Sequence, residues 1–283
     1  MTSTTGGWGR EIKDFARAFS GAYIFGIPLL FTMEMWWLGE YAALWKLLAF
    51  LLVALAANFG FSYAAGFKRE TSLGSALQQA VEALAVGIVA ATVMLLVLNR
   101  IQPGDPLDTI AGTIVIQAVP LSIGASVANE IFGRRGERQR QAEDHGNSNE
   151  AGLKPWQELF SDLGATVIGG IFVGFSIAPT EEIPMLAAEL DFGHLLALIG
   201  LSLLVSYASV FASGFDGAIP EGPFQKPLTE TTLAYVVSLL VAGASLYFFN
   251  QIEPGDSLRA VVAQTLVLGL PTTIGGAAGR LVI

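Results

Sequence analysis

The chain has 283 residues, of which 53% are hydrophobic and only 14% are charged, and its formal net charge at pH 7 is −9. Soluble globular domains carry roughly a quarter charged residues, so this composition excludes an ordinary soluble domain and predicts a membrane protein. The lack of cysteine excludes disulfides, cysteine metal sites and a thiol nucleophile. The acidic balance excludes nucleic acid as a partner, because phosphates require a basic surface. No cofactor is expected.

Eight apolar stretches are long enough for a helix to cross the hydrocarbon core, which takes about 20 residues. None shows the two-residue alternation of a barrel strand. The predicted fold class is therefore an all-α membrane protein with eight transmembrane helices surrounded by lipid, at residues 18–38, 42–66, 76–99, 109–131, 162–186, 193–214, 229–250 and 260–282.

The hydrophilic stretches divide the chain into four parts. Residues 1–17 form a charged N-terminal segment without the apolar core and cleavage site of a signal peptide. Residues 133–157 are mixed in charge and poor in apolar side chains, which predicts a flexible cytoplasmic linker. This linker separates a first membrane unit at 18–132 from a second at 158–283.

The two membrane units resemble each other in sequence. Asn99–Leu107 matches Asn250–Leu258, and without a gap Pro120 then falls on Pro271. This self-similarity indicates a duplication. Each half has an even number of spans, so the repeats are predicted to be parallel, with four helices each and with a site or pathway between them. The Pro-Gly-Asp of each copy predicts a turn whose aspartate caps the first amides of the next helix.

The basic residues predict the orientation. Of the fifteen Lys and Arg residues, all but Lys46, Arg100 and Arg259 fall on the side of the N-terminus. The positive-inside bias therefore predicts that both termini are cytoplasmic. The opposite, outer side carries most of the excess of acidic residues, and such a field concentrates cations at an entrance. The alternative is that these acids are solvated loop charges.

Carboxylates at the outer ends of spans one and five are the leading candidate site. Glu34 lies near the end of the first span, and Glu181 and Glu182 lie at the matching place in the fifth. Pro179 and Pro184 flank the second pair and predict a kinked or unwound helix there. Irregular backbone and carboxylates together suit a pathway and a metal-cation site formed by these three glutamates. The alternative is that they lie at headgroup level and solvate helix ends.

Further polar residues lie within the predicted spans, where they cost several kcal/mol unless they face a cavity or a partner. Glu82 is too deep to reach water easily, so we expect it to face the interior. Gln117 and Gln264 have a second reading as hydrogen bonds between helices. Oxygen ligands of this kind suit a proton, Ca²⁺, Mg²⁺ or Na⁺. The pathway candidates beyond the three glutamates are Asn58, Glu82, Gln117, Glu230 and Gln264.

Residues 10–283 as a whole, including the Ala178–Pro184 segment, resemble a prokaryotic family of multi-pass integral membrane proteins of unassigned function. The resemblance implies the architecture and little else; it implies no activity. We expect the protein to lie in a prokaryotic cytoplasmic (inner) membrane.

Two short segments resemble motifs of other families, but these resemblances imply less about the chain. Ala-Pro-x-Glu-Glu looks like the first motif of intramembrane glutamic proteases related to the CAAX prenyl endopeptidases, which follow the glutamates with an arginine and need later histidines. Here Leu186 stands at the arginine position and no histidine follows His194. Proteolysis is therefore the weakest alternative, and we expect the chain not to be an enzyme. The Pro-Glu segment of cation/Ca²⁺ exchangers belongs to inverted five-span repeats, which this chain lacks.

These observations predict a small-cation channel or a cation/proton-coupled transporter that uses intramembrane carboxylates. The competing class is a non-transporting membrane subunit or scaffold, in which the carboxylates pair with Lys46 or with a partner protein. The sequence leaves both classes open, together with assembly as a homo-oligomer.

Overall fold

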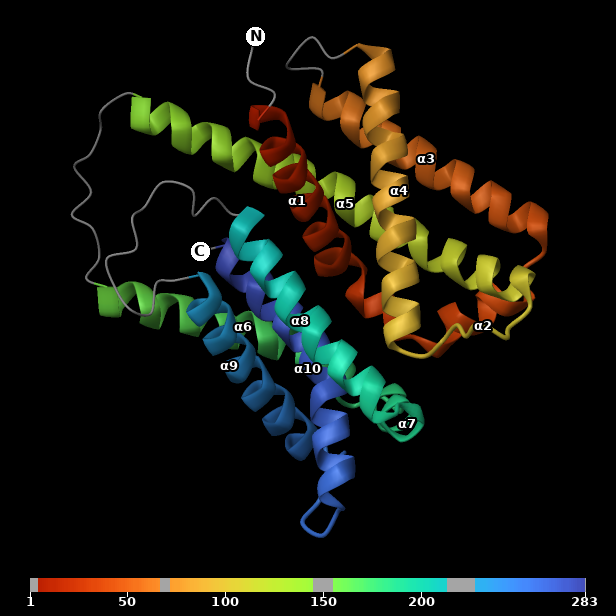
Figure 1. Cartoon of the computed structure of the whole chain (residues 1–283), viewed down its shortest axis with the longest axis vertical. Helices are drawn as coiled ribbons and strands as arrows, with labels where there is room; N and C mark the ends of the chain where they lie inside the picture. The colour runs from red at the N-terminus through yellow and green to blue at the C-terminus, as the bar shows by residue number, and fades with distance from the viewer. Residues whose placement is uncertain (1–4, 67–71, 145–154, 213–226, 283) are drawn as a thin grey trace.

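The computed structural model describes residues 5–66, 72–144, 155–212 and 227–282. Within these ranges every regular element is a helix (Figure 1). In chain order the helices are α1 (Thr5–Leu30), α2 (Met33–Tyr41), α3 (Leu44–Gly66), α4 (Leu73–Val97), α5 (Leu107–Asp144), α6 (Pro155–Ile177), α7 (Glu182–Glu189), α8 (Phe192–Ala212), α9 (Pro227–Phe248) and α10 (Leu258–Val282).

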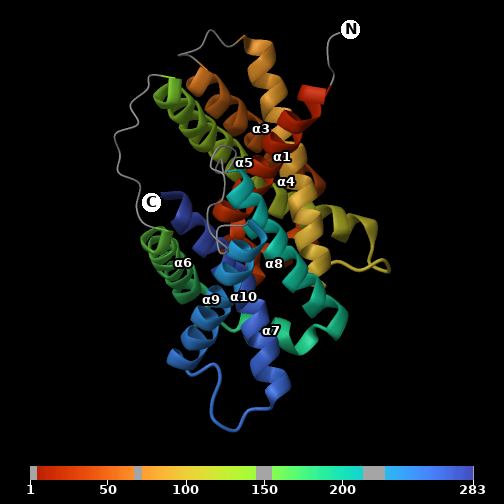
Figure 2. The ribbon, with the colours of Figure 1, turned by 60° about the vertical axis from the view of Figure 1, so that its left-hand side comes forward.

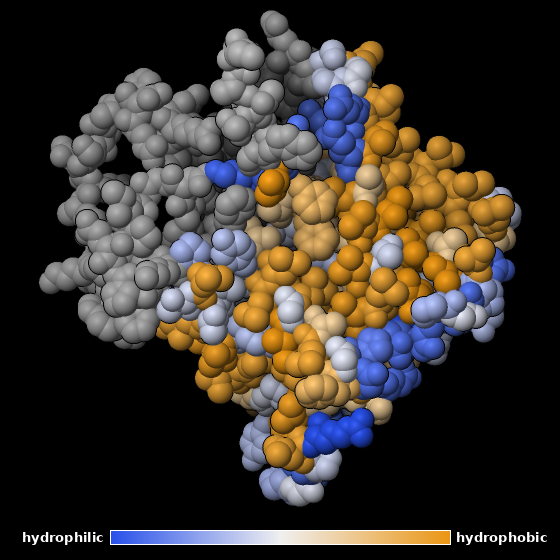
Figure 3. Space-filling view, viewed as in Figure 1, coloured by the Kyte–Doolittle hydropathy of each residue, from blue (hydrophilic) through white to orange (hydrophobic). Residues whose placement is uncertain are grey.

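Six of the described helices are long and apolar enough to cross a membrane: α3, α4, α5, α8, α9 and α10. Two further pairs, α1 with α2 and α6 with α7, are long and apolar enough only when each pair is counted as one span. Counting them gives up to eight spans. Figure 3 shows apolar side chains over most of the described surface of one face, with hydrophilic residues gathered towards the helix ends. This surface is typical of a multi-pass integral membrane protein, which the chain is.

The first and fifth predicted spans are broken rather than straight. Each pair bends by 89°, so α2 and α7 run across the direction of the helices that precede them. The disruption that Pro179 and Pro184 predict in span five is confirmed, because α6 ends at Ile177. The break in span one was not predicted. There Thr32 donates a hydrogen bond from its hydroxyl to the carbonyls of Pro28 (3.1 Å) and Leu29 (2.8 Å) and so occupies the helix end.

The helices pack as two bundles, which we call the N-terminal bundle (α1–α5) and the C-terminal bundle (α6–α10). In the first, α5 contacts α1, α2, α3 and α4; in the second, α10 contacts α6, α7, α8 and α9. The bundles meet chiefly where α1 lies against α8, with smaller contributions from α4, α6 and α10 (Figures 1 and 2). The inner helices α5 and α10 are therefore the most enclosed members of each bundle.

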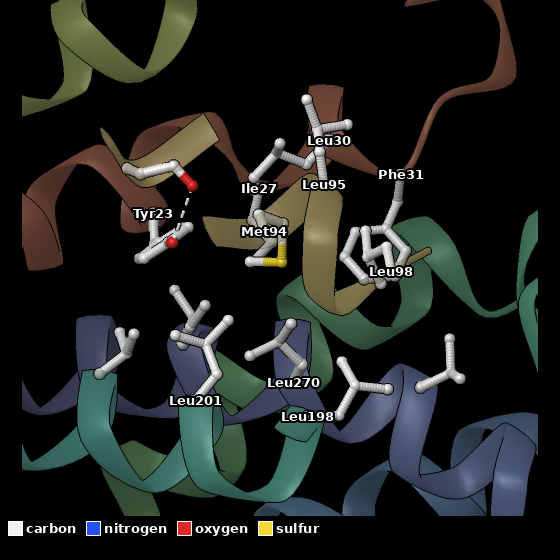
Figure 4. Packing of buried hydrophobic residues seen from close by; sticks show 14 of the residues in the cluster. Tyr23, Ile27, Leu30, Phe31, Met94, Leu95, Leu98, Leu198, Leu201 and Leu270 are labelled. Carbon is white, nitrogen blue, oxygen red and sulfur yellow. Dashed lines mark hydrogen bonds between the residues drawn. The ribbon is translucent and has the colours of Figure 1, made fainter. Parts of the chain in front are cut away.

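The space between the bundles is filled by apolar side chains. In Figure 4, Ile27 and Met94 of the N-terminal bundle face Leu201 and Leu270 of the C-terminal bundle. The surrounding residues belong to one cluster, in which members such as Leu95 and Leu198 are completely buried. The phenol of Tyr23 is also buried there, and its hydroxyl donates to the Ala90 carbonyl at 2.9 Å.

The ends of α4 and α9 have the same backbone conformation. Asn99 and Asn250 have positive φ angles, 55° and 57°, which asparagine tolerates better than most residues. The amides of Arg100 and Gln251 then donate to carbonyls five residues earlier, at 2.8 and 2.9 Å, which completes a Schellman motif at each end.

The turns that follow contain the Pro-Gly-Asp sequences. The carboxylates of Asp105 and Asp256 accept hydrogen bonds from the amides of Gln102 (2.7 Å) and Glu253 (2.8 Å). The prediction that these aspartates cap the next helix is therefore wrong, because each closes its own turn instead.

The predicted linker at 133–157 is shorter than expected. Helix α5 continues as far as Asp144, and α6 already begins at Pro155. Only residues 145–154 of the predicted linker lie outside the described part of the chain.

Candidate functional site

The three glutamates predicted to share a cation site lie at the two bends. Glu34 is exposed in the first turn of α2, and Glu181 is exposed at the residue before α7. Glu182 is half-buried in the first turn of α7. Among the described residues, no group of three or more His, Cys, Asp or Glu is placed to hold a metal ion. The structure therefore does not assemble the predicted metal site from these carboxylates.

Glu82 does not face the interior. Its side chain is exposed on α4 and accepts a 2.8 Å hydrogen bond from the side-chain amide of Gln78, one turn earlier. The prediction was wrong because Ala80 and Ala83, three residues apart, form the buried face of α4, and Glu82 lies on a different face of the helix.

Asn58 and Gln117 lie buried within the N-terminal bundle. The Asn58 amide donates to the Ser122 hydroxyl, and its carbonyl accepts from the Ser126 hydroxyl, both at 3.0 Å. These bonds join α3 to α5 and use both ends of the amide. Gln117 donates to the Leu29 carbonyl at 3.5 Å, while its own side-chain oxygen has no partner among the described residues. Asn58 thus forms hydrogen bonds between helices, which was the alternative given above for Gln117.

Glu230 is the one predicted glutamate that is buried. It lies in the first turn of α9 with a side chain 8% exposed, and it pairs with the guanidinium of Arg280, also 8% exposed, near the end of α10. Asp162 on α6 lies close enough to Arg280 to interact with it electrostatically. We call Glu230, Arg280 and Asp162 the charged triad. Its members come from three helices that pack against one another, α6, α9 and α10.

The hydrogen bonds of the triad are incomplete. Neither Nε nor Nη1 of Arg280 has a hydrogen-bond partner among the described residues, although both atoms are buried. A buried donor without an acceptor costs about 1–3 kcal/mol, and more when it is charged. The guanidinium therefore has unused donors beside a second carboxylate.

A seam of small and polar side chains continues from the triad between α6, α9 and α10. A Cβ atom at Gly276 would come within 3.2 Å of the Ser238 hydroxyl, and one at Gly174 within 3.3 Å of the Ser245 hydroxyl. Thr272 donates to the Ser238 carbonyl at 3.2 Å. Ser245 satisfies its own hydroxyl within α9, by donating to a carbonyl one turn earlier at 2.7 Å.

Buried polar atoms without partners occur in the seam, at Ser238, and elsewhere on α10, at Gln264. The Ser238 hydroxyl and the side-chain oxygen of Gln264 are both buried, and neither has a partner among the described residues. Gln264 and Arg280 lie near opposite ends of α10, and at 1.5 Å per residue they are separated by about 24 Å along the helix. Buried polar groups therefore extend along most of the length of α10.

A second charged group joins the two bundles at the end where the helices bend. Arg100 follows the Schellman motif of α4, contacts the carboxylate of Glu189 on α7, and lies 5.0 Å from the centre of the Trp36 ring on α2. Burial lowers the pKa of the Arg100 guanidinium, while the Glu40 carboxylate raises it. Arginine remains cationic even so, because its ordinary pKa lies far above neutral pH.

Sequence reasoning missed Arg280, Asp162 and Arg100 as site residues. It treated Arg280 and Arg100 only as markers of orientation, and it did not consider Asp162. One signal was present: Arg280 follows the small-residue run Gly275–Gly279 in an apolar helix, and small residues mark close helix packing where a charge needs a partner. No sequence signal pointed to the pairing of Arg100 with Glu189.

Comparison with known proteins gives one family. Residues 14–283 match the family model described as "Putative integral membrane protein (DUF2391)". The chain belongs to this family. No curated protein matches it, and no solved structure matches it. The family supports the integral membrane assignment from the helices and carries no activity of its own.

Proposed function

We propose that this protein moves a small cation across the membrane and that the site of exchange is the charged triad of the C-terminal bundle. The observation that carries the proposal is the burial of Glu230 with Arg280 between apolar helices. Ionisable side chains at such positions are expensive and commonly mark ion or proton pathways. The unpartnered hydroxyl of Ser238 in the same seam supports a route there.

The packing between the bundles favours a different function. The apolar cluster around Met94, Leu201 and Leu270 closes the centre of the molecule, and no described carboxylate lines it. This is the second candidate, a membrane subunit or scaffold that transports nothing. The proposed route therefore runs within the C-terminal bundle and not between the two bundles.

Several finer features belong to the same proposal. The chain consists of two parallel repeats, α1–α5 and α6–α10, supported by the matching order of bent pair and three long helices and by the matching turns at Asn99 and Asn250. It resides in a prokaryotic inner membrane with both termini cytoplasmic, which the distribution of Lys and Arg supports. We propose further that it is not an enzyme; Leu186 at the arginine position and the lack of a histidine after His194 weaken the protease alternative.

Flux measurements in liposomes test the transport function. Purified protein is reconstituted, and the movement of H⁺, Na⁺, K⁺, Ca²⁺ and Mg²⁺ is followed with and without a pH gradient. We expect flux of at least one ion above that of empty liposomes, and its loss in Glu230→Gln. Glu82→Gln is the matched control, since that carboxylate is exposed. No flux of any ion with the native protein would leave the scaffold function.

A further inference from the structure

We infer that α2 lies along the membrane surface and that its exposed aromatic side chains bind the headgroup region of the phospholipid bilayer. This inference goes beyond the proposed function and holds with or without transport. It starts from the 89° bend between α1 and α2. Membrane-crossing helices tilt from the bilayer normal by about 20° on average, so a helix perpendicular to α1 lies close to the membrane plane, at the end of the N-terminal bundle (Figure 1).

Helix α1 is long enough to make the first crossing without α2. It has 26 residues, which give about 39 Å at 1.5 Å per residue. Its charged side chains lie in its first half, which is the half farther from α2. The crossing therefore leaves α2 free to follow the membrane surface.

One side of α2 is fixed against the N-terminal bundle. Trp36 is 3% exposed, and its indole donates a hydrogen bond to the Leu30 carbonyl at 3.0 Å. Gly39 lies so close to α5 that a Cβ atom on it would come within 2.4 Å of the Cα atom of Thr113. These contacts determine which side of α2 faces away from the protein.

The side that faces away carries aromatic and apolar residues. Trp37 is 56% exposed although its neighbour is buried, and Leu38 and Tyr41 are also exposed. After the short connection to α3, Leu44 and Trp45 are exposed as well. We call these five residues the aromatic surface. Along the chain it leads directly into the exposed apolar side chains of α3, a helix long and apolar enough to cross the bilayer, so lipid is the partner that both surfaces share.

The chemistry of the exposed residues determines the depth of α2. Tryptophan and tyrosine are enriched at membrane–water interfaces, because their rings are apolar while their N–H and O–H groups are polar. Glu34 and Glu40 are exposed on the same helix, and carboxylates are costly in the hydrocarbon core. The Lys46 ammonium lies 5.7 Å from the centre of the Trp45 ring, where it can pair with lipid phosphates. This combination suits the boundary between headgroups and acyl chains, where apolar faces of such helices lie about 5–10 Å deep.

The other bent helix lacks this surface. Helix α7 makes the same 89° angle with α6, but within its described residues, Glu182–Glu189, no large apolar side chain is exposed. Its exposed residues are Ala188 and Glu189. The aromatic surface is therefore a property of α2 and not a consequence of the bend itself.

Fluorescence quenching in lipid vesicles tests the inference on two neighbouring tryptophans. Two variants of the full chain each keep one tryptophan, Trp37 or Trp36, with phenylalanine at the other tryptophan positions. They are reconstituted in phosphatidylcholine brominated at defined acyl carbons. We expect the brominated lipids to lower the fluorescence of Trp37, most strongly when the bromine is near the carbonyl end of the chain. Trp36 is the matched control and should keep its fluorescence, because it is buried.

A second variant leaves the buried residues unchanged, in case the single-tryptophan chains do not fold. Trp37→Phe in the otherwise native chain alters only an exposed side chain. It should reduce the fraction of the fluorescence that brominated lipids quench, because the native protein then loses one of its lipid-facing tryptophans.

Other outcomes would overturn the inference. Quenching of Trp37 by aqueous acrylamide but not by brominated lipids would place α2 in water. Strongest quenching by bromine near the methyl end of the chain would place α2 in the hydrocarbon core. Protection of Trp37 from both quenchers would mean that another protein chain, such as a second copy, covers the aromatic surface.

Discussion

Buried polar residues in this protein fall into two kinds at the scale of single side chains. Asn58 uses both its donor and its acceptor, so it stabilises the contact between α3 and α5. Arg280 has buried donors left over, and Gln264 and Ser238 have unpartnered oxygens. Complete hydrogen bonding is typical of structural groups, whereas a buried charged group with unused donors needs a further partner.

Replacing Asn58 should measure how much a fully hydrogen-bonded buried residue contributes to stability. Hydrogen bonds between membrane helices contribute about 0.6 kcal/mol each on average. Asn58→Ala removes two of them and is expected to lower the free energy of unfolding by about 1 kcal/mol, as measured by titration with a denaturing detergent in mixed micelles. Ser126→Ala removes one bond and should lose about half as much. Equal stability of the native protein and Asn58→Ala would show that these bonds contribute nothing.

Asp191 provides a pH prediction outside the spans. Its carboxylate accepts a hydrogen bond from the backbone amide of His194 at 2.9 Å and contacts the His194 ring at 2.7 Å. The hydrogen bond from the amide is the main reason why the pKa of Asp191 lies below its ordinary value. A lowered pKa in the folded state means that the capping interaction is present above the ordinary aspartate pKa and is lost as pH falls through the folded value.

Hydrogen exchange measures this cap. The His194 amide should stay protected at neutral pH and lose protection only below the ordinary pKa of an aspartate, about 3.9. In Asp191→Asn, the same amide should show protection that no longer changes with pH in this range. Loss of protection in the native protein already near neutral pH would contradict the assignment of the cap to the Asp191 carboxylate.

At the scale of helices, close backbone contact between α6 and α10 determines the position of the charged triad. A Cβ atom at Gly169 would lie 2.1 Å from the carbonyl oxygen of Gly275, and one at Gly279 would lie 2.3 Å from that of Ala165. Only glycine allows these helices to approach so closely, as in other small-residue contacts between membrane helices. This approach brings Asp162 and Arg280 together.

Gly169→Ala should therefore separate the two helices. The clash is with backbone, which cannot move aside as a flexible side chain could, so we expect a loss of about 1–3 kcal/mol in the free energy of unfolding. Gly200→Ala on α8 is the control, because its Cβ would meet nothing within 4 Å. That change should be neutral or stabilising by up to about 1 kcal/mol, since alanine favours a helix over glycine. Equal effects of the two substitutions would contradict the close contact.

For the whole molecule, the two bundles are held together by apolar packing in the middle and by Arg100 at the end where α2 and α7 lie. The apolar cluster stabilises the contact by burying apolar surface, which does not by itself favour one orientation of the two bundles. Arg100 adds a specific connection, since its guanidinium contacts Trp36 and Glu189 on different bundles. The cluster leaves little room for ions between the bundles, which is why the proposed route lies within one of them.

Arg100→Gln should weaken the contact between the bundles. It removes a cation–π contact and an ion pair whose carboxylate is 44% exposed, so the expected loss is about 1–2 kcal/mol in the free energy of unfolding. Detergent-induced unfolding measures this loss, and added salt should reduce it by screening the ion pair. Arg259→Gln, at the exposed start of α10, is the control and should have no effect. A double-mutant cycle with Glu189→Gln that shows no coupling would contradict the pairing.

The sequence by itself determined that the chain crosses the membrane many times, because runs of about 20 apolar residues have no other stable environment. It also located the disruption after α6, since Pro179 and Pro184 limit the local backbone whatever surrounds them. Only the tertiary structure decided which polar residues meet. Glu82 and Glu230 are both glutamates in apolar helices, yet one is exposed and the other is paired with an arginine fifty positions later in the chain. Hydropathy depends on composition along the chain, whereas burial and pairing depend on which helix faces pack together, and contacts between distant helices decide that.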